Sequence, residues 1–377
     1  MDFKGLLALM VQKKASDLFI TAERAPTIKV DGALVEVSRT LLTADQTLKI
    51  VLSIMDQRQK NEFENTKECQ FAINVPDLGR FRVSAFTQRD SAGMVLRRIE
   101  SDIPDADDLN LPAVLKDLIM EKRGLIIFVG GTGTGKSTSL AALIKHRNQN
   151  SRGHIITIED PIEFHHPHLG CIITQREVGI DTESYEVALK NTLRQAPDVI
   201  LIGEIRTRET MQNAITFAET GHLCLSTLHA NNANQALDRI LHFFPDEMRD
   251  QLLMDLSLNL KGIVAQQLIK RADEKGRYPA VEILINTPLA KDYIRKGEIH
   301  KLKELMKESR EQAMQTFDQA LFDLYMAGKI SYEDALNSAD SRNEVRLMIK
   351  LNTENAGAFE NNNMLLSETD DDNRFIK

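Results

Sequence analysis

The sequence predicts an α/β protein with a mostly parallel sheet that carries helices on both faces. Four apolar strand segments alternate with four helix segments between residues 124 and 242, and this alternation is typical of parallel βαβ units. A glycine-rich turn follows the first strand, so we expect phosphate-binding residues at the carboxyl ends of the strands. The predicted strands are 124–129, 154–159, 198–205 and 222–228, and the predicted helices are 136–148, 184–195, 208–220 and 233–242.

The first 100 residues predict a smaller α+β domain. The stretch MDFKGLLALMVQKKASD has helically spaced apolar residues and an acid at position 2, so we expect an amphipathic helix and not a signal peptide. Alternating segments over 27–34 and 80–86 predict strands, and the segment 43–64 predicts a helix capped by Thr43.

Composition shifts divide the rest of the chain. The segment SDIPDADDLNLP is acidic, contains two prolines and lacks periodicity, which is typical of a linker. Segments after about residue 284 are helical in pattern, and one of them ends on Gly328. The acid-rich end of the chain predicts a disordered tail, with a simple role in solubility as the alternative. The predicted parts are an N-terminal domain (1–100), a linker (101–112), an α/β core (113–285), a helical C-terminal subdomain (286–352) and an acidic tail (353–377).

The composition argues against several classes of protein. No apolar run approaches the roughly 20 residues that span a bilayer, so we expect no transmembrane segment. The net charge of −8 disfavours nonspecific binding to nucleic acid. Cys69, Cys171 and Cys224 are odd in number and far apart, which predicts reduced thiols, no zinc site and a cytoplasmic location.

The nine residues GGTGTGKST, Gly130 to Thr138, predict a phosphate-binding loop. They fit the pattern G-x-x-x-x-G-K-[ST] between a strand and a helix, and an ordinary glycine-rich turn is the alternative. Glycines let backbone N–H groups point at phosphate oxygens, and the helix start adds its positive end. Lys136 should reach the β and γ phosphates, and Ser137 should hold Mg²⁺. The predicted nucleotide-binding residues are Gly131, Thr132, Gly133, Thr134, Gly135, Lys136, Ser137 and Thr138.

Carboxylates and histidines lie near the ends of the next three strands. Glu159 ends the strand in IITIEDPIEF and Glu204 follows the strand in DVILIGEIR, so both can orient water or hold Mg²⁺. Most phosphate-loop ATPases place Asp before that Glu, whereas Gly203 stands here, which leaves more of the metal binding to Glu204. His222 and His229, near the ends of the strand in TGHLCLSTLHAN, are suited to sensing a γ phosphate by hydrogen bonding.

Four segments, in order and spacing, resemble the phosphate loop, Asp box, Walker B and His box of type II/IV secretion and pilus ATPases: GGTGTGKST, IEDPIEF, LIGEIR and TGHLCLSTLHAN. The resemblance covers about residues 1–350, including ASDLFI, GRFRVSAF and LRQAPDVILIGEIR, and is to the type IV pilus retraction ATPases of the PilT/PilU group. Assembly ATPases are longer and generally carry a four-cysteine metal site, which this chain lacks. The segment 294–325, without an AIRNLIRE element, and the acidic tail resemble the PilU branch more than the PilT branch.

The resemblance implies a homohexamer with a PAS-like N-terminal domain, a RecA-like P-loop core and a helical C-terminal appendage. ATP and Mg²⁺ would lie between the two domains, with Glu159 favoured for orienting water and Glu204 for holding the metal. The implied partners are a PilT-like ATPase and an inner-membrane pilus platform protein. The implied location is cytoplasmic, peripherally associated with the inner membrane at the pilus base.

Arginines of the first domain are further candidates, because the γ-phosphate charge in hydrolysis needs cationic stabilisation. Arg80, Arg82 and Arg97 match the family's arginines that reach the nucleotide, and we take Arg82 and Arg97 as catalytic candidates. A solvated basic strand face is the alternative. The histidines of FHHPH, residues 164–168, predict a loop beside Asp160 and no metal site.

The expected function is ATP hydrolysis that drives domain motion and powers or assists pilus retraction. One alternative is a weakly active accessory subunit that modulates a PilT-like motor, although Lys136, Glu159, Glu204 and His229 argue against an inert adaptor. A RecA-like DNA translocase is a third hypothesis, which the acidic balance disfavours and a salt-dependent affinity for DNA would favour.

Overall fold

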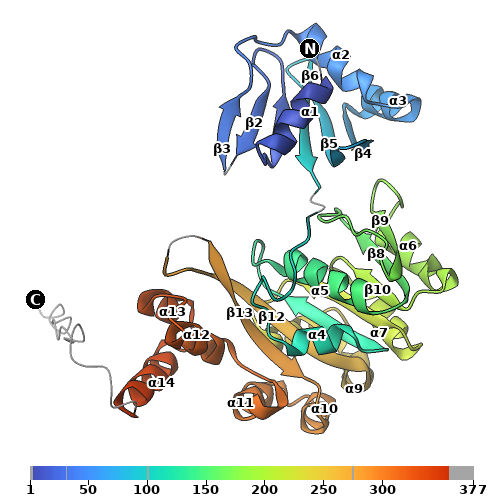
Figure 1. Ribbon diagram of the computed structural model, residues 1–377. Helices are drawn as coiled ribbons and strands as arrows, with labels where there is room; N and C mark the ends of the chain where they lie inside the picture. Colours follow the sequence, from blue (N-terminus) through green and yellow to red (C-terminus); the bar gives the residue numbers. More distant parts are fainter. Residues whose placement is uncertain (1–2, 31, 100–101, 274–275, 356–377) are drawn as a thin grey trace, which may run out of the picture.

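The computed structural model describes residues 3–30, 32–99, 102–273 and 276–355, which build two separate sheets (Figure 1). The first sheet has the order β3-β2-β1-β6-β5-β4 with every neighbouring pair antiparallel, and helices α1 to α3 close an apolar core against it. Its strands are β1 (Asp17–Ile20), β2 (Thr27–Val30), β3 (Ala33–Glu36), β4 (Glu68–Val75), β5 (Gly79–Gln88) and β6 (Ser91–Arg98), and its helices are α1 (Phe3–Gln12), α2 (Ala44–Ser53) and α3 (Gln57–Thr66).

Two predictions for this region are wrong in detail. The predicted strand over 27–34 is a pair of strands, β2 and β3, because Gly32, with a φ of +83°, allows the chain to turn back. The predicted helix over 43–64 is two helices. Thr43 caps the first with a capping box, as predicted, but Asp56 forms a second capping box with Gln59 and starts α3.

The second sheet has the order β13-β12-β7-β11-β10-β8-β9 and is parallel except for β13, which confirms the predicted mostly parallel sheet. All four predicted strands form, although the third ends at Ile202 and not at 205, while β9, β12 and β13 were not predicted. The strands are β7 (Gly124–Val129), β8 (Gly153–Glu159), β9 (Cys171–Glu177), β10 (Val199–Ile202), β11 (Leu223–Leu228), β12 (Leu260–Lys270) and β13 (Arg277–Ile285).

Helices cover both faces of this sheet, and β7 shows why. Its alternate residues point in opposite directions, so Leu125 and Ile127 join one apolar core and Ile126 and Phe128 join the other. Helices α4 and α5 close the second of these cores, and α6 to α9 close the first. Each fully buried Leu, Ile or Phe adds roughly 1.5–3 kcal/mol of hydrophobic stabilisation. The helices are α4 (Val114–Ile119), α5 (Lys136–Asn150), α6 (Tyr185–Thr192), α7 (Arg208–Glu219), α8 (Ala233–His242) and α9 (Arg249–Asn259).

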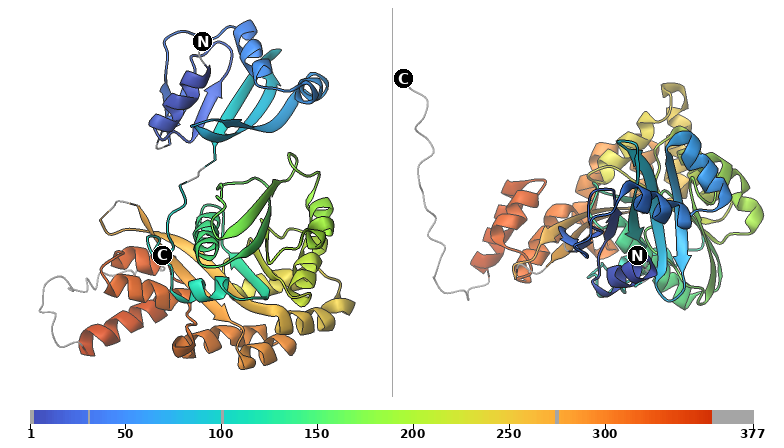
Figure 2. Two further views of the ribbon diagram at one scale, coloured as in Figure 1. Left: turned by 45° about the vertical axis from the view of Figure 1, so that its right-hand side comes forward. Right: turned by 90° about the horizontal axis from the view of Figure 1, so that it is seen from above.

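The region after β13 is helical, as predicted, and lies beside β12 and β13 (Figure 2). The helix that precedes Gly328 ends at Met326, and that glycine has a φ of +67°. Short helical turns separate some of these elements. The helices are α10 (Pro288–Arg295), α11 (Leu302–Glu308), α12 (Phe317–Met326), α13 (Tyr332–Ser338) and α14 (Arg342–Asn355).

The predicted domain boundaries remain predictions, but two of them can be compared with the elements. The described part of the linker, 102–112, contributes Ala106 and Leu111 to the core beneath α4 and α5. The predicted acidic tail, 353–377, begins inside α14, and its residues 356–377 lie outside the described residues. Within the described ranges, no helix has both the length and the apolar composition needed to cross a bilayer.

Candidate functional site

The predicted phosphate-binding loop joins β7 to α5, and its backbone requires glycine at two positions at least. Gly130 has a φ of +152° and Gly135 a φ of +85°, which other residues rarely adopt. A Cβ atom at Gly130 would lie 2.7 Å from the carbonyl oxygen of Gln266, and one at Gly135 would lie 2.8 Å from the Nε2 atom of Gln266. The loop therefore curls tightly against β12 and ends at the N-terminus of α5, where backbone N–H groups favour a bound anion.

Lys136 lies inside this loop. Its side chain is buried, and its Nζ atom donates hydrogen bonds to the carbonyl oxygens of Gly130 at 2.8 Å and Gly131 at 2.7 Å. Burial lowers the pKa of Lys136, while the carboxylates of Glu163 and Glu204 act in the opposite direction. The ammonium group is thus held against the loop carbonyls, within electrostatic range of two acids.

Gln266 on β12 supports the loop and was not predicted from the sequence. Its Nε2 atom donates to the carbonyl oxygen of Thr134 at 2.8 Å, and its Oε1 atom accepts from the Ser139 hydroxyl at 2.8 Å. The side chain is 1 % exposed, so both bonds are made out of contact with water. The signal in the sequence is a glutamine pair within the otherwise apolar run LKGIVAQQLI.

Glu159 lies at the end of β8 and is half-buried. Its Oε1 atom accepts hydrogen bonds from Thr157 Oγ1 at 2.6 Å and from Gln175 Nε2 at 3.3 Å. Burial raises the pKa of Glu159 to about 7, while these two hydrogen bonds act to lower it and the nearby Glu163 acts to raise it. Such a carboxyl group can exchange a proton near neutral pH.

Glu204 follows β10 and contacts two side chains, Arg206 and His229. It forms an ion pair with Arg206, and its Oε2 atom is 3.3 Å from Nε2 of His229, which follows β11. The two strands are also joined by a hydrogen bond of 2.6 Å from Thr227 Oγ1 to the carbonyl oxygen of Gly203. The structure therefore brings together Glu204 and His229, which the sequence places 25 residues apart.

Gly203 explains the departure from the usual Walker B pattern. A Cβ atom at this position would lie 2.8 Å from the hydroxyl of Tyr185 and 3.1 Å from the Cα atom of Glu159. An aspartate before Glu204 would therefore press against the backbone of β8, and the strand would have to shift to admit it. The acid of this strand must come from position 204.

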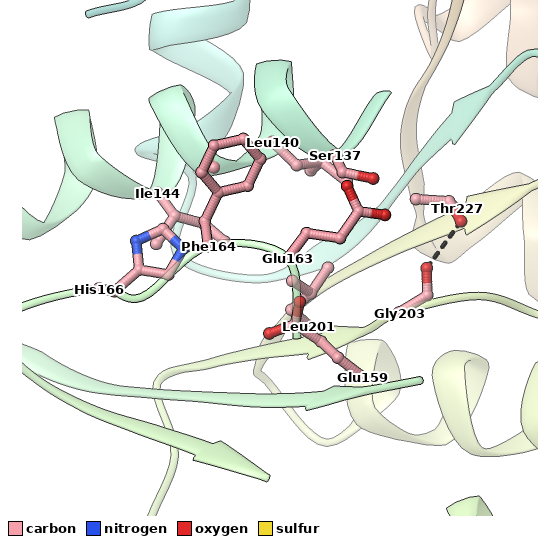
Figure 3. A pocket seen from close by; sticks show the side chains of 11 residues that line it. Ser137, Leu140, Ile144, Glu159, Glu163, Phe164, His166, Leu201, Gly203 and Thr227 are labelled. Atoms are coloured by element: carbon pink, nitrogen blue, oxygen red, sulfur yellow. Dashed lines mark hydrogen bonds between the residues drawn. The ribbon is translucent and has the colours of Figure 1, made fainter. Parts of the chain in front are cut away.

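One small pocket lies between the start of α5 and the ends of β8 and β10 (Figure 3). Ser137 on α5 lines it together with Glu159 and Gly203, and Figure 3 shows Glu163 reaching toward Ser137 from the turn after β8. Glu163 is one of the carboxylates of the predicted segment IEDPIEF, in which Glu159 was the acid favoured for orienting water. The pocket thus joins the start of α5 to the ends of β8 and β10, where polar chemistry in open parallel sheets is expected.

A second cavity, of about 360 Å³, lies on the other side of the loop. Gly135 and Thr138 line it from the loop, and Asp108 lines it from the linker. The guanidinium of Arg271 lies over the ring of Tyr278, with its Cζ atom 4.6 Å from the ring centre. Flat groups of this kind, with polar atoms at the rim, suit a planar ligand.

The candidate arginines of the first domain lie in two different settings. Arg82 Nε is 3.6 Å from the buried Glu177 Oε1 on β9, and Arg80 Nη2 is 3.7 Å from Asp181 Oδ2 just beyond it. Arg97 Nε instead pairs with Asp17 Oδ1 at 2.8 Å inside the first domain. None of these contacts involves the phosphate-binding loop, so the predicted role of Arg82 and Arg97 at the nucleotide remains a prediction.

The histidines of FHHPH follow Glu163 and make contacts with β9. His166 is buried, its backbone N–H donates to Gln175 Oε1 at 2.8 Å, and burial lowers the pKa of its side chain to about 4. His168 Nδ1 accepts a hydrogen bond from the backbone N–H of Ile173 at 3.0 Å. Both histidines therefore hold the turn after β8 against the edge of the sheet.

Comparison with known proteins identifies related sequences and structures. Residues 3–336 match the family model described as type II/IV secretion system protein. The chain is 64 % identical over 354 residues to the type IV pilus ATPase PilU of Pseudomonas aeruginosa, covering 94 % of this chain and 93 % of that one. It is 39 % identical over 339 residues to the type IV pilus retraction ATPase PilT of the same organism, covering 90 % and 98 %. A crystal structure of the pilus retraction motor PilT with bound ADP matches with a TM-score of 0.86 at 36 % identity, covering 92 % and 100 %.

Proposed function

This chain belongs to the type II/IV secretion system protein family and, within it, to the PilT/PilU group of type IV pilus ATPases, and we propose that it hydrolyses ATP to power or assist pilus retraction. The observation that carries this proposal is the buried Lys136 inside a glycine loop, with Glu159 and Glu204 at neighbouring strand ends. A lysine cradled by loop carbonyls and facing acids is suited to neutralise phosphate charge.

The nucleotide would occupy the space on both sides of the loop. Gly131 to Thr138 would bind the phosphates through backbone N–H groups and Lys136. The cavity between Arg271, Tyr278 and the linker would take the nucleoside, because it adjoins the loop at Gly135 and Thr138. The PilT structure with bound ADP supports a nucleotide at this fold.

The residues present also fit Mg²⁺. Ser137 and Glu204 supply the hydroxyl and carboxylate oxygens that this ion prefers, and they lie at the start of α5 and after the end of β10. Bound Mg²⁺ would offset the negative charge of the β and γ phosphates. Glu159, with its raised pKa, would take a proton from the attacking water, and His229 would hold the Glu204 carboxylate in place.

We propose the assembly and its surroundings from the similarity to PilU and PilT. We place the chain in a homohexamer that acts in the cytoplasm, peripherally bound to the inner membrane at the pilus base, together with a PilT-like ATPase and the platform protein. Support for this comes from the similarity to PilU over 94 % of the chain and to PilT over 90 % of it. If the chain is instead an accessory subunit beside a PilT-like motor, pilus retraction should not depend on ATP hydrolysis at this chain's own site.

Retraction assays in a strain that lacks this protein test the proposal. Wild-type chain should restore twitching and pilus retraction, and the Glu204→Ala variant should not, because the acid beside His229 is lost. The same pair is tested with and without the PilT-like companion. Restoration of movement by Glu204→Ala in the presence of the companion would support the accessory role, and failure of the wild-type chain to restore movement would contradict both.

Replacement of the candidate arginines should lower hydrolysis more than nucleotide binding. We expect Arg82→Ala and Arg97→Ala each to reduce steady-state ATPase at least about tenfold, because arginines that approach the γ phosphate act mainly on the transition state. Pilus retraction should fall with it. The matched control is Arg24→Ala, since Arg24 is an exposed arginine of the first domain, in the connection between β1 and β2, that pairs with Glu36. Normal ATPase activity in both variants would show that Arg82 and Arg97 form only structural ion pairs, with Glu177 and Asp17, and do not act on the nucleotide.

A further inference from the structure

Glu282 is a buried acid in the middle of β13, away from the phosphate-binding loop. It stands in the apolar run AVEILI and is 1 % exposed. Alternate residues of a strand share a face, so Glu282 points the same way as Ala280 and Leu284, into the core that α6 to α9 close. A buried carboxyl group costs free energy unless it is hydrogen-bonded, so the partners of Glu282 bear on its role.

The carboxyl group of Glu282 contacts the first residue of α8. Its Oε1 atom accepts a hydrogen bond from the backbone N–H of Ala233 at 2.8 Å. The first N–H groups of a helix have no partner within the helix, and the side chain of the preceding Asn232 accepts a different one, that of Gln235. Burial raises the pKa of Glu282 to about 7, whereas the Ala233 N–H acts to lower it. Glu282 therefore fixes the start of α8 to the sheet.

The start of α8 in turn sets the place of His229. Only residues 230–232 separate His229, which follows β11, from Ala233. Helix α8 also holds His229 directly, since Arg239 Nη1 donates to the carbonyl oxygen of His229 at 2.8 Å. His229 Nε2 lies 3.3 Å from Glu204 Oε2. A shift of about 1 Å at this end of α8 would therefore carry the imidazole out of hydrogen-bond reach of the carboxylate.

We propose that Glu282 is a positioning residue for ATP hydrolysis, which fixes the start of α8 and thereby keeps His229 against Glu204. The inference rests on the proposed role of His229 in holding that carboxylate. It assigns Glu282 no contact with the nucleotide, because this side chain is buried and lines neither of the two pockets beside the loop. Loss of the acceptor at position 282 should therefore slow hydrolysis and leave ATP binding largely unchanged.

Two variants of the full chain separate the hydrogen bond from the charge. Glu282→Met removes the acceptor for Ala233 at similar length, whereas Glu282→Gln removes the charge and keeps an oxygen that can accept. Glu282→Met should lower kcat about tenfold with KM for ATP within about threefold, and Glu282→Gln should keep kcat within about threefold, since a misplaced group acts mainly on kcat. Wild-type kcat in Glu282→Met, or an equal loss in both variants, would overturn the inference.

A double variant shows whether Glu282 acts through His229. We expect His229→Ala to lower kcat at least about tenfold, and the addition of Glu282→Met to lower it by less than about twofold further, because the contribution of His229 can be lost only once. Independent effects would multiply, so a further loss as large as that of Glu282→Met alone would overturn the inference. A slow His229→Ala beside a normal Glu282→Met overturns only the role of Glu282. If His229→Ala keeps the wild-type kcat, the proposed role of His229 fails and the inference fails with it.

Asp318→Leu is the matched control. Asp318 is also buried, at 2 % exposed, and accepts the backbone N–H groups of Asp340 and Ser341, but none of its described hydrogen bonds involves α8. The control should lower the thermal midpoint, as Glu282→Met should, but keep kcat within about twofold of wild type. A loss of kcat as large as that of Glu282→Met would show that any loosening of the C-terminal helices slows hydrolysis, and the specific role of Glu282 would be overturned.

Discussion

Lys136→Ala should reduce ATP hydrolysis to background while the chain remains folded. The Nζ atom is the one cation held inside the loop by described contacts, through the carbonyl oxygens of Gly130 and Gly131, and alanine leaves no positive charge there. The charge of the β and γ phosphates would then be unscreened by the protein side chain, both on binding and as charge develops in the transition state. ATPase turnover with Mg²⁺ and ATP is the primary measurement.

The folded state should tolerate this change. Burial already disfavours the charged form of Lys136, which is why its pKa is lowered, so its removal also relieves a desolvation cost. We expect the thermal midpoint without nucleotide to stay within about 2 °C of wild type, since 1 kcal/mol corresponds to a shift of about 1–2 °C in a chain of 377 residues. Saturating ATP should raise the thermal midpoint of the wild type, because a ligand at 100 times its Kd adds about 2.7 kcal/mol to the stability of the folded state. This rise should disappear in Lys136→Ala.

Lys190→Ala provides the matched control, because Lys190 is an exposed lysine on α6. It should keep both turnover and the nucleotide-dependent shift. Wild-type turnover in Lys136→Ala would show that the loop does not bind the hydrolysed phosphates. Loss of the fold in Lys136→Ala would contradict the expectation that this side chain serves the ligand and not the core.

The residues that the sequence predicted well are those whose position depends on local structure. A loop between a strand and a helix is fixed by its own glycines, so Lys136 and Ser137 could be placed before the fold was known. Glu159, Glu204 and His229 could be brought together because adjacent parallel strands end at one edge of a sheet.

The residues that escaped prediction depend on strands that escaped prediction. Gln175 and Gln266 lie on β9 and β12, whose sequences mix polar with apolar residues and lack a clear alternation. The Gln175 side chain bonds to Glu159 on β8, and the Gln266 side chain bonds to Thr134 in the loop. Arg82 and Arg97 show a different limit. Both lie on strands with the expected alternation, but their partners, Glu177 and Asp17, depend on long-range packing that spacing does not encode.

Glu159→Gln should slow hydrolysis at least about a hundredfold while ATP still binds, the scale expected for a lost general base. The amide matches the carboxylate in size, so Ser137 and the rest of the pocket keep their places, but it cannot accept a proton from water. Single-turnover hydrolysis and equilibrium binding of ATP measure the two effects separately. Normal hydrolysis by this variant would remove Glu159 from the chemistry and leave Glu163 or Glu204 as the base.

The pH dependence of hydrolysis identifies the base independently. Burial raises the pKa of Glu159 to about 7, and only the deprotonated form can take a proton, so wild-type turnover should rise with pH through about 7. At one pH unit below that pKa only about a tenth of the carboxyl groups are ionised, and at one unit above it about nine-tenths are. The residual activity of Glu159→Gln should lack this rise, whereas that of Glu204→Ala should retain it, because Glu159 is still present. A rise near pH 7 that persists in Glu159→Gln would place the titrating group elsewhere, and the partner of the attacking water would then have to be sought among the other acids of the pocket.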